Sequence, residues 1–427
     1  GKTRLAPSFV KDVADIVNAQ CGDSLPVSAF MEYADGTMPA GTSAFEKRGV
    51  AVNVPEWNPE KCIQCNTCSF VCPHAAIRPF LLTGEEAEAA PGTVKTAQGK
   101  AVLKDYRFAI SISVDDCTGC GNCVDVCLAK DKALSMVPYQ SQVNEQANFD
   151  YLNSKIGYKQ VVDKKSNLKN SQFAQPLFEY SGACAGCGET PYIKNITQLF
   201  GDHMMIANAT GCSSIYGASF PASPYCTDAN GHGPAWANSL FEDFCEFGLG
   251  MKLGSDRVRE TVASLMTQGL SCSCCSDEIK ALFQKWLDNR NDAAATREVA
   301  DKLVPLMKEC SCDICSKLLD LKSYIPARSQ WIIGGDGASY DIGYGGLDHV
   351  IASGENVNIL VLDTEVYSNT GGQSSKATPA GAIAKFAASG KKIRKKDLGM
   401  MAISYGYVYV AQVAMGASPA QYLNAIK

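Results

Sequence analysis

The sequence predicts a small α+β domain followed by a larger α/β domain with a doubly wound parallel sheet. A run of four cysteines that occurs twice between residues 56 and 140 indicates the smaller domain. Short, continuous apolar runs at 331–333 and 358–362, each bounded by turn signals, indicate strands buried on both faces of a parallel sheet. Helical patterns at 279–287 and 293–304 accompany these runs, and such alternation is typical of an α/β fold.

The composition of the chain argues against two classes of binding partner, nucleic acids and membranes. The chain has 427 residues, a net charge of −5 and 46% hydrophobic residues, which is typical of globular proteins. At roughly 150 residues per domain, two or three domains fit this length. The mildly acidic balance without a basic stripe argues against a nucleic-acid partner. No apolar run approaches the roughly 18–20 residues that cross a bilayer, so we expect no membrane partner.

Three segments are expected along the chain. Residues 1–50 are turn-rich and form a connecting segment, residues 51–157 contain both cysteine runs, and residues 158–427 contain the expected parallel sheet. The first residue is Gly1, and residues 422–427 read as a helix cut in mid-course. We therefore interpret the chain as a piece of a larger polypeptide whose last domain is truncated at its carboxyl end.

Twenty cysteines are a high number for a chain of this kind. In a short secreted chain they would indicate disulfides. Here the chain is long, shows no signal-peptide pattern, and groups its cysteines at metal-ligand spacings. These features favour thiolate–metal sites in a reducing compartment, and we expect a cytoplasmic protein.

The repeated cysteine run has the spacing of proteins that hold two [4Fe–4S] clusters. Each copy spaces its cysteines at x2, x2 and x3, and the fourth cysteine of each run binds the other cluster in such proteins. Gly119 and Gly121 are expected to let the backbone wrap around a cluster. Two zinc sites are the alternative, but zinc frameworks rarely show this spacing twice. The predicted ligands are Cys62, Cys65, Cys68 and Cys127 for cluster one, and Cys117, Cys120, Cys123 and Cys72 for cluster two.

A third group of cysteines has a less specific pattern. Cys184 and Cys187 form a Cys-x2-Cys pair on a glycine-rich segment, and Cys212 follows on another. These residues would supply three ligands of a third cluster, which needs a fourth. A redox dithiol and a zinc site stay open as alternatives, because both use Cys-x2-Cys pairs.

The segment after the first apolar run favours a magnesium-bound diphosphate. Asp336 offers a carboxylate oxygen, and Mg²⁺ prefers hard oxygen ligands. Gly335 and Gly337 let the backbone approach phosphate groups closely. A hydroxyl or carbonyl group from the loop 363–372 would complete the shell, because α/β sheets bind small molecules at the carboxyl ends of parallel strands. A Gly-Asp-Gly sequence alone usually marks a turn, and the asparagine-bearing loop after the second strand is what favours a site.

Together these segments resemble the pyruvate:ferredoxin (flavodoxin) oxidoreductase family. The resemblance rests on the paired cysteine runs and on the segments 184–190, 210–214, 233–243 and 367–373, which occur in the family's order. It covers nearly the whole chain. The chain looks like the carboxy-terminal half of that enzyme, with a connecting segment, a two-cluster ferredoxin-like domain and most of a thiamine-diphosphate domain.

The resemblance implies roles for individual residues. The side chains of Asp336 and Thr364 and the carbonyl of Val366 would hold Mg²⁺, and Asn369 would be the catalytic residue next to thiamine diphosphate and substrate. Cys184, Cys187 and Cys212 would bind a proximal cluster whose fourth ligand lies in a segment that this chain lacks. The implied cofactor-binding residues are Glu189, Cys212, Gly335, Asp336, Gly337, Ala338, Thr364, Val366 and Asn369.

The resemblance also implies the reaction. It is the oxidative decarboxylation of pyruvate to acetyl-CoA and CO2, with coenzyme A as co-substrate and single electrons passed through three [4Fe–4S] clusters to ferredoxin or flavodoxin. It further implies anaerobic metabolism, a homodimer, and amino-terminal domains that complete the active site. Another 2-oxo acid on the same machinery and a non-catalytic electron-transfer module are the alternatives.

Nine cysteines outside these motifs have no role in the resemblance: Cys272, Cys274 and Cys275, Cys310, Cys312 and Cys315, and the isolated Cys21, Cys226 and Cys245. The two Cys-x2-Cys pairs among them, Cys272/Cys275 and Cys312/Cys315, would suit zinc or another metal. We nevertheless expect incidental reduced thiols in both groups. The isolated cysteines are expected to be small buried side chains.

Overall fold

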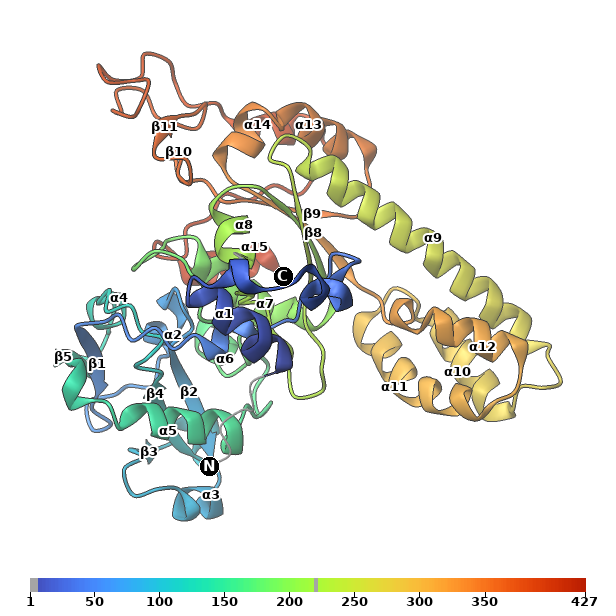
Figure 1. Cartoon of the computed structure of the whole chain (residues 1–427), viewed down its shortest axis with the longest axis horizontal. Helices are drawn as coiled ribbons and strands as arrows, with labels where there is room; N and C mark the ends of the chain where they lie inside the picture. Colours follow the sequence, from blue (N-terminus) through green and yellow to red (C-terminus); the bar gives the residue numbers. More distant parts are fainter. Residues whose placement is uncertain (1–6, 219–221) are drawn as a thin grey trace. The chain divides into compact units, whose positions relative to one another are not determined.

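The computed structural model describes residues 7–218 and 222–427 (Figure 1). These residues divide into two compact units. Unit 1 comprises residues 1–202, 212–234 and 411–427, and unit 2 comprises residues 203–211 and 235–410. The first six residues of the predicted connecting segment lie outside the described residues. These two units reflect how compactly the chain is folded and do not test the domain boundaries predicted at residues 50 and 157. Those boundaries stay a prediction.

Unit 1 contains two small antiparallel sheets. One pairs β1 (Asn53–Trp57) with β5 (Leu134–Pro138), so that the segments before and after the cysteine runs lie side by side. The other has the order β2-β4-β3, with β2 (Ile77–Leu82), β3 (Ala97–Gln98) and β4 (Arg107–Ile112). Trp57, Leu103 and Phe108 are buried between these strands, and predicted cluster cysteines pack against this core.

The helices of unit 1 are mostly short. A π-helical turn at Val10–Ala14 leads into α1 at the start, and α2 and α4 each contain the third cysteine of a run. The helices are α1 (Asp15–Asn18), α2 (Thr67–Val71), α3 (Gly84–Ala89), α4 (Asn122–Asp125), α5 (Glu145–Tyr151), α6 (Leu168–Ser171), α7 (Thr190–Phe200), α8 (Cys212–Ala218) and α15 (Pro419–Ile426).

Unit 2 is built on a four-stranded, wholly parallel sheet, which fits the α/β prediction. The strand order is β7-β6-β8-β9, with β6 (Met204–Ala209), β7 (Ala235–Ser239), β8 (Ser329–Gly334) and β9 (Asn358–Val361). The strands predicted at 331–333 and 358–362 are confirmed as neighbours, with Ile332 opposite Ile359. The expectation that both are fully buried is wrong for β9, which lies at the sheet edge and is half-buried.

One long helix links this sheet to a group of shorter helices within unit 2 (Figure 1). Helix α9 (Phe244–Leu270) packs on β6 and β8, where a Cβ at Gly248 would lie 2.5 Å from Cγ1 of Ile332. Its other end packs against α10 (Asp277–Asp288) and α12 (Asp313–Asp320), and α11 (Ala293–Glu309) packs on both of these. The helices predicted at 279–287 and 293–304 are therefore confirmed.

The remaining elements of unit 2 lie beyond β8. A π-helical turn at Gly337–Asp341 is followed by α13 (Tyr344–Ser353), by a hairpin of β10 (Val366–Tyr367) and β11 (Gln373–Ser374), and by α14 (Leu398–Ile403). None of the described helices is both long and apolar enough to span a bilayer.

The isolated cysteines differ from one another. Cys226 and Cys245 are buried, as expected, with 3% and 0% of their surface exposed. Cys21 is exposed, so the expectation of burial is wrong for this residue. It lies in a turn between α1 and a short 3-10 helix, Gly22–Ser24, none of whose residues is buried.

Candidate metal and cofactor sites

The two cysteine runs of unit 1 fold into equivalent loops. Left-handed backbone conformations occur at Gln64 and Asn66 in the first loop and at Gly119 and Gly121 in the second, which are matching positions of the repeat. Only glycine adopts this conformation without cost. A Cβ at Gly119 would also lie 2.9 Å from the carbonyl oxygen of Asn53, so this position has little room for a side chain.

Side-chain hydrogen bonds accompany the strained conformations of the first loop. The buried Gln64 amide donates to the Gln98 carbonyl at 2.8 Å and accepts from the backbone N–H of Lys100 at 3.0 Å. Asn66 donates to the Lys169 carbonyl at 2.9 Å. The first loop therefore obtains its turns from anchored amide side chains, whereas the second obtains them from glycine.

Backbone N–H groups donate to the cysteine sulfurs in the same pattern in both halves. The residue two positions after the first cysteine donates to its sulfur at 3.4 Å in each run, Gln64 to Cys62 and Gly119 to Cys117. The fourth cysteines also accept, Cys72 from Ala76 at 3.4 Å and Cys127 from Ala133 at 3.2 Å. Such bonds stabilise thiolates, which are the form that binds iron.

The structure brings each fourth cysteine to the run of the other half. Burial and then the neighbouring Cys62, Cys65 and Cys127 sulfurs raise the pKa of Cys68. Burial also raises the pKa of Cys117 to about 12, with Cys72 and Cys120 as sulfur neighbours. A hollow is lined by all four predicted ligands of cluster two, Cys72, Cys117, Cys120 and Cys123. The residues thus gather in the crossed arrangement that the spacing predicts.

A buried lysine lies directly behind the first run. The ammonium group of Lys194 donates to the carbonyl oxygens of Ser69, of Phe70 at 3.0 Å and of Cys72 at 3.1 Å, at the end of α2. Only 1% of its surface is exposed, and burial lowers its pKa to about 8. Sequence reasoning missed this residue, because its place on the apolar helix α7 gives no signal of a contact with residues so far back in the chain.

The third cysteine group also comes together within unit 1. Burial raises the pKa of Cys212 to about 12, with Glu189, Cys187 and Cys184 as charged neighbours. Gly186, between the two cysteines of the pair, adopts a left-handed conformation with φ at 74° and its N–H bonds to Cys120. The group therefore lies next to the predicted cluster-two ligands.

Glu189 is a buried acid at the edge of this group, with 8% of its surface exposed. Burial raises its pKa, and the Tyr216 phenol offsets part of that rise. Among the residues that the structure describes, none hydrogen-bonds its Oε2 atom. A buried carboxyl oxygen without a partner is expensive and is typical of a functional position.

In unit 2 the predicted magnesium ligands meet at the carboxyl ends of β8 and β9. The Oδ1 atom of Asp336 accepts the backbone N–H of Thr364 at 3.0 Å, and its Oδ2 atom accepts the Ser375 hydroxyl at 3.1 Å. The Thr364 hydroxyl lies 3.2 Å from the Val366 carbonyl oxygen. Burial raises the pKa of Asp336 to about 7. The donor set is one buried carboxylate, one hydroxyl and one carbonyl, which fits the preference of Mg²⁺ for hard oxygens.

The other predicted cofactor-binding residues of unit 2 differ in how closely they are packed and how far they are exposed. A Cβ at Gly337 would lie 2.1 Å from Cε1 of Tyr367, and Ala338 is buried. Gly335 accepts the backbone N–H of Ser339 at 3.0 Å. Asn369 is exposed on the turn after β10. Ser375 is a supporting residue that sequence reasoning missed, because no motif connects it with Asp336.

Models of three protein families match separate parts of the chain. Residues 2–51 match a domain of unknown function, residues 55–128 match a 4Fe-4S dicluster domain, and residues 317–427 match the carboxy-terminal thiamine-pyrophosphate-binding domain of thiamine pyrophosphate enzymes. The second match contains all eight cysteines of the repeat. The third contains Asp336, Thr364, Val366 and Asn369. A ferredoxin-type domain and a thiamine-enzyme domain are therefore present.

Similar proteins extend the match to almost the entire chain. A pyruvate-flavodoxin oxidoreductase of Klebsiella pneumoniae is 58% identical over 99% of this chain and 36% of its own length. A pyruvate:ferredoxin oxidoreductase of Moorella thermoacetica is 54% identical over 98% of the chain and 36% of its own length. A pyruvate dehydrogenase [NADP(+)] of Cryptosporidium parvum is 46% identical over 98% of the chain and 23% of its own length. The chain therefore spans about a third of the length of the two oxidoreductases from Klebsiella pneumoniae and Moorella thermoacetica that it matches.

Proposed function

We propose that this chain is the electron-conducting and thiamine-diphosphate-binding part of an enzyme that oxidatively decarboxylates pyruvate to acetyl-CoA and CO2. The observation that carries the proposal is the 58% identity to a pyruvate-flavodoxin oxidoreductase over 99% of the chain. The chain spans 36% of that relative, so the activity, substrates and partners of the whole enzyme are inferred from relatives. Electrons would leave to ferredoxin or flavodoxin, the acceptors in the relatives' names.

Unit 2 would hold Mg²⁺ and the diphosphate of the cofactor. Asp336, the Thr364 hydroxyl and the Val366 carbonyl would be the metal ligands, and Gly335, Gly337 and Ala338 would let the backbone approach the phosphates. When bound, thiamine diphosphate supplies the electron sink that makes loss of CO2 from a 2-oxo acid possible. The hydrogen bonds from Thr364 and Ser375 fix both oxygens of Asp336, so the carboxylate is oriented before the metal arrives.

The remaining predicted residues would act at the reacting end of the cofactor. Asn369 would be the catalytic side chain beside the substrate, and Glu189 would be a buried acid close to the cofactor. Amino-terminal domains of the same enzyme would supply further groups and a coenzyme A site. We also propose a doubly wound sheet for residues 158–427, a connecting segment at 1–50, a ferredoxin-like domain at 51–157, a homodimer and a cytoplasmic enzyme.

Unit 1 would conduct the electrons through three [4Fe–4S] clusters. Cys184, Cys187 and Cys212 would hold the first cluster together with a ligand from outside this chain. The Gly186 N–H bonds to Cys120, a predicted ligand of cluster two, which supports electron passage from the first cluster to cluster two. Cluster two is then linked to cluster one through the crossed ligands. Cys72 of the first run would bind cluster two, and Cys127 of the second run would bind cluster one.

The proposal is tested on the complete enzyme under anaerobic conditions. The reduction of ferredoxin and of flavodoxin is measured with pyruvate and with 2-oxoglutarate, each with and without coenzyme A. We expect reduction with pyruvate that depends on coenzyme A and is lost in Asp336→Asn but kept in Asp348→Asn, a control on α13 of the same unit. Reduction with 2-oxoglutarate alone would assign a different 2-oxo acid, and no reduction with any 2-oxo acid would leave an electron-transfer module.

A further inference from the structure

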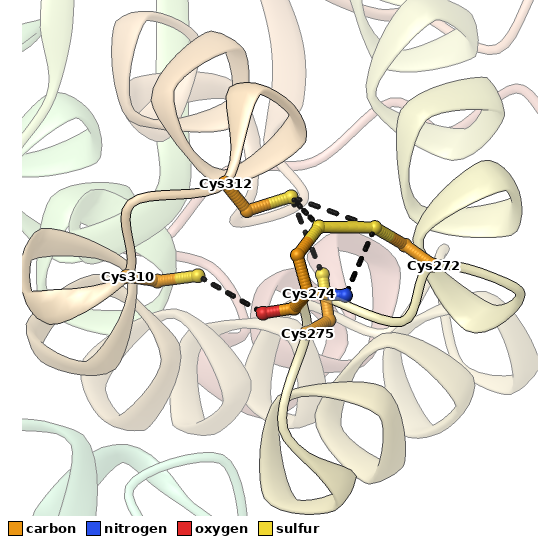
Figure 2. Close-up of a disulfide and its surroundings, with 5 residues drawn as sticks. All are labelled: Cys272, Cys274, Cys275, Cys310 and Cys312. Carbon is orange, nitrogen blue, oxygen red and sulfur yellow. Dashed lines mark hydrogen bonds between the residues drawn. A yellow bond between two sulfur atoms is a disulfide. The ribbon is translucent and has the colours of Figure 1, made fainter.

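Six cysteines outside the predicted sites gather at one point of unit 2. Three lie in the loop between α9 and α10, namely Cys272, Cys274 and Cys275, and three at the start of α12, namely Cys310, Cys312 and Cys315. Figure 2 shows the sulfurs of Cys274, Cys275 and Cys312 pointing toward one another from these two loops. The expectation of incidental thiols does not explain why two loops 35 residues apart place all their cysteines together.

The six cysteines comprise one disulfide pair and four free thiols. The Sγ atoms of Cys272 and Cys274 are joined by a disulfide. Four other cysteines, Cys275, Cys310, Cys312 and Cys315, are free. The Sγ atom of Cys312 lies 3.7 Å from that of Cys275, and the sulfurs of Cys310, Cys312 and Cys315 lie within 4.8 Å of one another. Cys275 also hydrogen-bonds Cys315.

These separations are the size expected around a single metal ion. Four sulfurs at a Zn–S distance of about 2.3 Å in a tetrahedron stand about 3.8 Å apart. The cysteine sulfurs of a [4Fe–4S] cube stand farther apart, because each binds a different iron. Three of the four free cysteines are buried, with exposed fractions of 5% for Cys275, 5% for Cys312 and 0% for Cys315. A set of sulfur ligands that belongs to a hydrophobic core suits a soft thiophilic ion.

We propose that Cys275, Cys310, Cys312 and Cys315 bind one structural Zn²⁺ ion, with the Cys272–Cys274 disulfide beside the site. All four positions are closed by protein sulfurs, so the ion would have no open position for a substrate. It would join the α9–α10 loop to the start of α12. The four helices around it share a core of large side chains, among them Phe283, Trp286 and Leu303, and the ion would fasten the end of that core.

The direct test measures zinc and its ligands in the full chain, purified anaerobically without added zinc. Zinc per chain is determined by mass spectrometry, and the coordination shell by X-ray absorption at the zinc edge, to which iron clusters do not contribute. We expect about one zinc per chain, bound to four sulfurs at about 2.3 Å. Background zinc, iron in place of zinc at this site, or zinc bound mainly by nitrogen and oxygen would overturn the proposal.

Variants locate the ligands. Cys312→Ser and Cys315→Ser are each expected to bring the zinc content to background, whereas the double variant Cys272→Ser/Cys274→Ser keeps it. Cys245→Ser is the matched control, because Cys245 is fully buried on α9 of the same unit and lies outside the cluster. Loss of zinc in the double variant would overturn this ligand set in favour of the two Cys-x2-Cys pairs. If a ligand variant fails to fold, the absorption spectrum of the unaltered chain still decides.

Discussion

The cysteines of residues 62–127 and those of residues 272–315 differ in how far apart in the chain the members of one predicted or proposed ligand set lie. In unit 1 each run places its ligands two or three residues apart, and the same loop occurs twice with left-handed turns at matching positions. In unit 2 the sulfurs meet only because a helical group brings two distant loops together. Ligands that are close in the chain can be predicted from spacing, whereas ligands assembled by tertiary structure cannot.

The largest expected effect separates crossed from local ligation in unit 1. With crossed ligands, Cys65→Ser/Cys127→Ser removes two ligands of cluster one and spares cluster two. By contrast, Cys72→Ser/Cys127→Ser removes one ligand from each cluster and is expected to lose both. Iron and sulfide analysis together with electron paramagnetic resonance of the reduced chains gives the number of clusters.

Local ligation predicts no difference between these two double variants. If each run held its own cluster, Cys65→Ser/Cys127→Ser would damage both clusters and Cys72→Ser/Cys127→Ser would also damage both. Retention of one cluster in the first variant therefore supports crossing, and loss of both clusters there would contradict it. Cys226→Ser, a buried cysteine of unit 1 outside the runs, is the control for nonspecific loss of iron.

The second effect concerns the oxygen site of unit 2, which is also assembled from distant segments. Asp336→Asn removes the charged metal ligand and is expected to weaken Mg²⁺-dependent binding of thiamine diphosphate more than Ser375→Ala does. Ser375 only orients the carboxylate at 3.1 Å, and loss of such a supporting residue typically costs roughly 10–100-fold in metal affinity. Calorimetric titration of the complete enzyme measures both. Equal losses in the two variants would contradict the assignment of Asp336 as the ligand.

A smaller effect concerns the buried lysine behind the first cysteine run. Lys194→Met removes the donor of the Ser69, Phe70 and Cys72 carbonyl oxygens, and we expect about 2–3 kcal/mol less stability. Denaturant unfolding under anaerobic conditions measures this loss. Lys164→Met is the control, because among the residues that the structure describes this half-buried lysine donates to a single carbonyl, that of Gln198. An unchanged unfolding midpoint in Lys194→Met would show that these hydrogen bonds contribute nothing.

The smallest effect separates two glycines of unit 2. Gly337→Ala would place a methyl group against the Tyr367 ring and is expected to cost about 1–2 kcal/mol of stability. Gly345→Ala, on the exposed side of α13 with nothing within 4 Å, is expected to stabilise by about 0.5–1 kcal/mol. Thermal unfolding of the two variants should therefore shift in opposite directions. A stabilising shift in Gly337→Ala as well would mean that the Tyr367 ring moves aside without cost.

Much of the fold could be predicted from the sequence because its signals are local. The apolar runs at 331–333 and 358–362 are strands, and the parallel pairing of β8 with β9 places Asp336 beside Thr364 as the rule for α/β sheets predicts. The turns of the loop in the second cysteine run could be predicted from Gly119 and Gly121. The matching turns at Gln64 and Asn66 could not be predicted, because their left-handed conformation depends on hydrogen bonds to distant backbone groups.

Contacts between distant segments account for the rest. Ser375 meets Asp336 across 39 positions, and Lys194 reaches back 122 positions to Cys72, with no pattern in the chain that marks either pair. The half-burial of β9 follows from its edge position, which a single apolar run does not reveal. The cysteines of 272–315 had the right spacing for a metal, but their meeting point is a property of the helical group.

We propose that electrons taken from a 2-oxo acid enter the clusters of unit 1. Electron paramagnetic resonance of the complete, anaerobically purified enzyme tests it most directly, recorded after addition of pyruvate with and without coenzyme A. We expect reduced-cluster signals that appear with pyruvate and grow when coenzyme A is present. Signals that respond only to dithionite, with no change after pyruvate or any other 2-oxo acid, would contradict it.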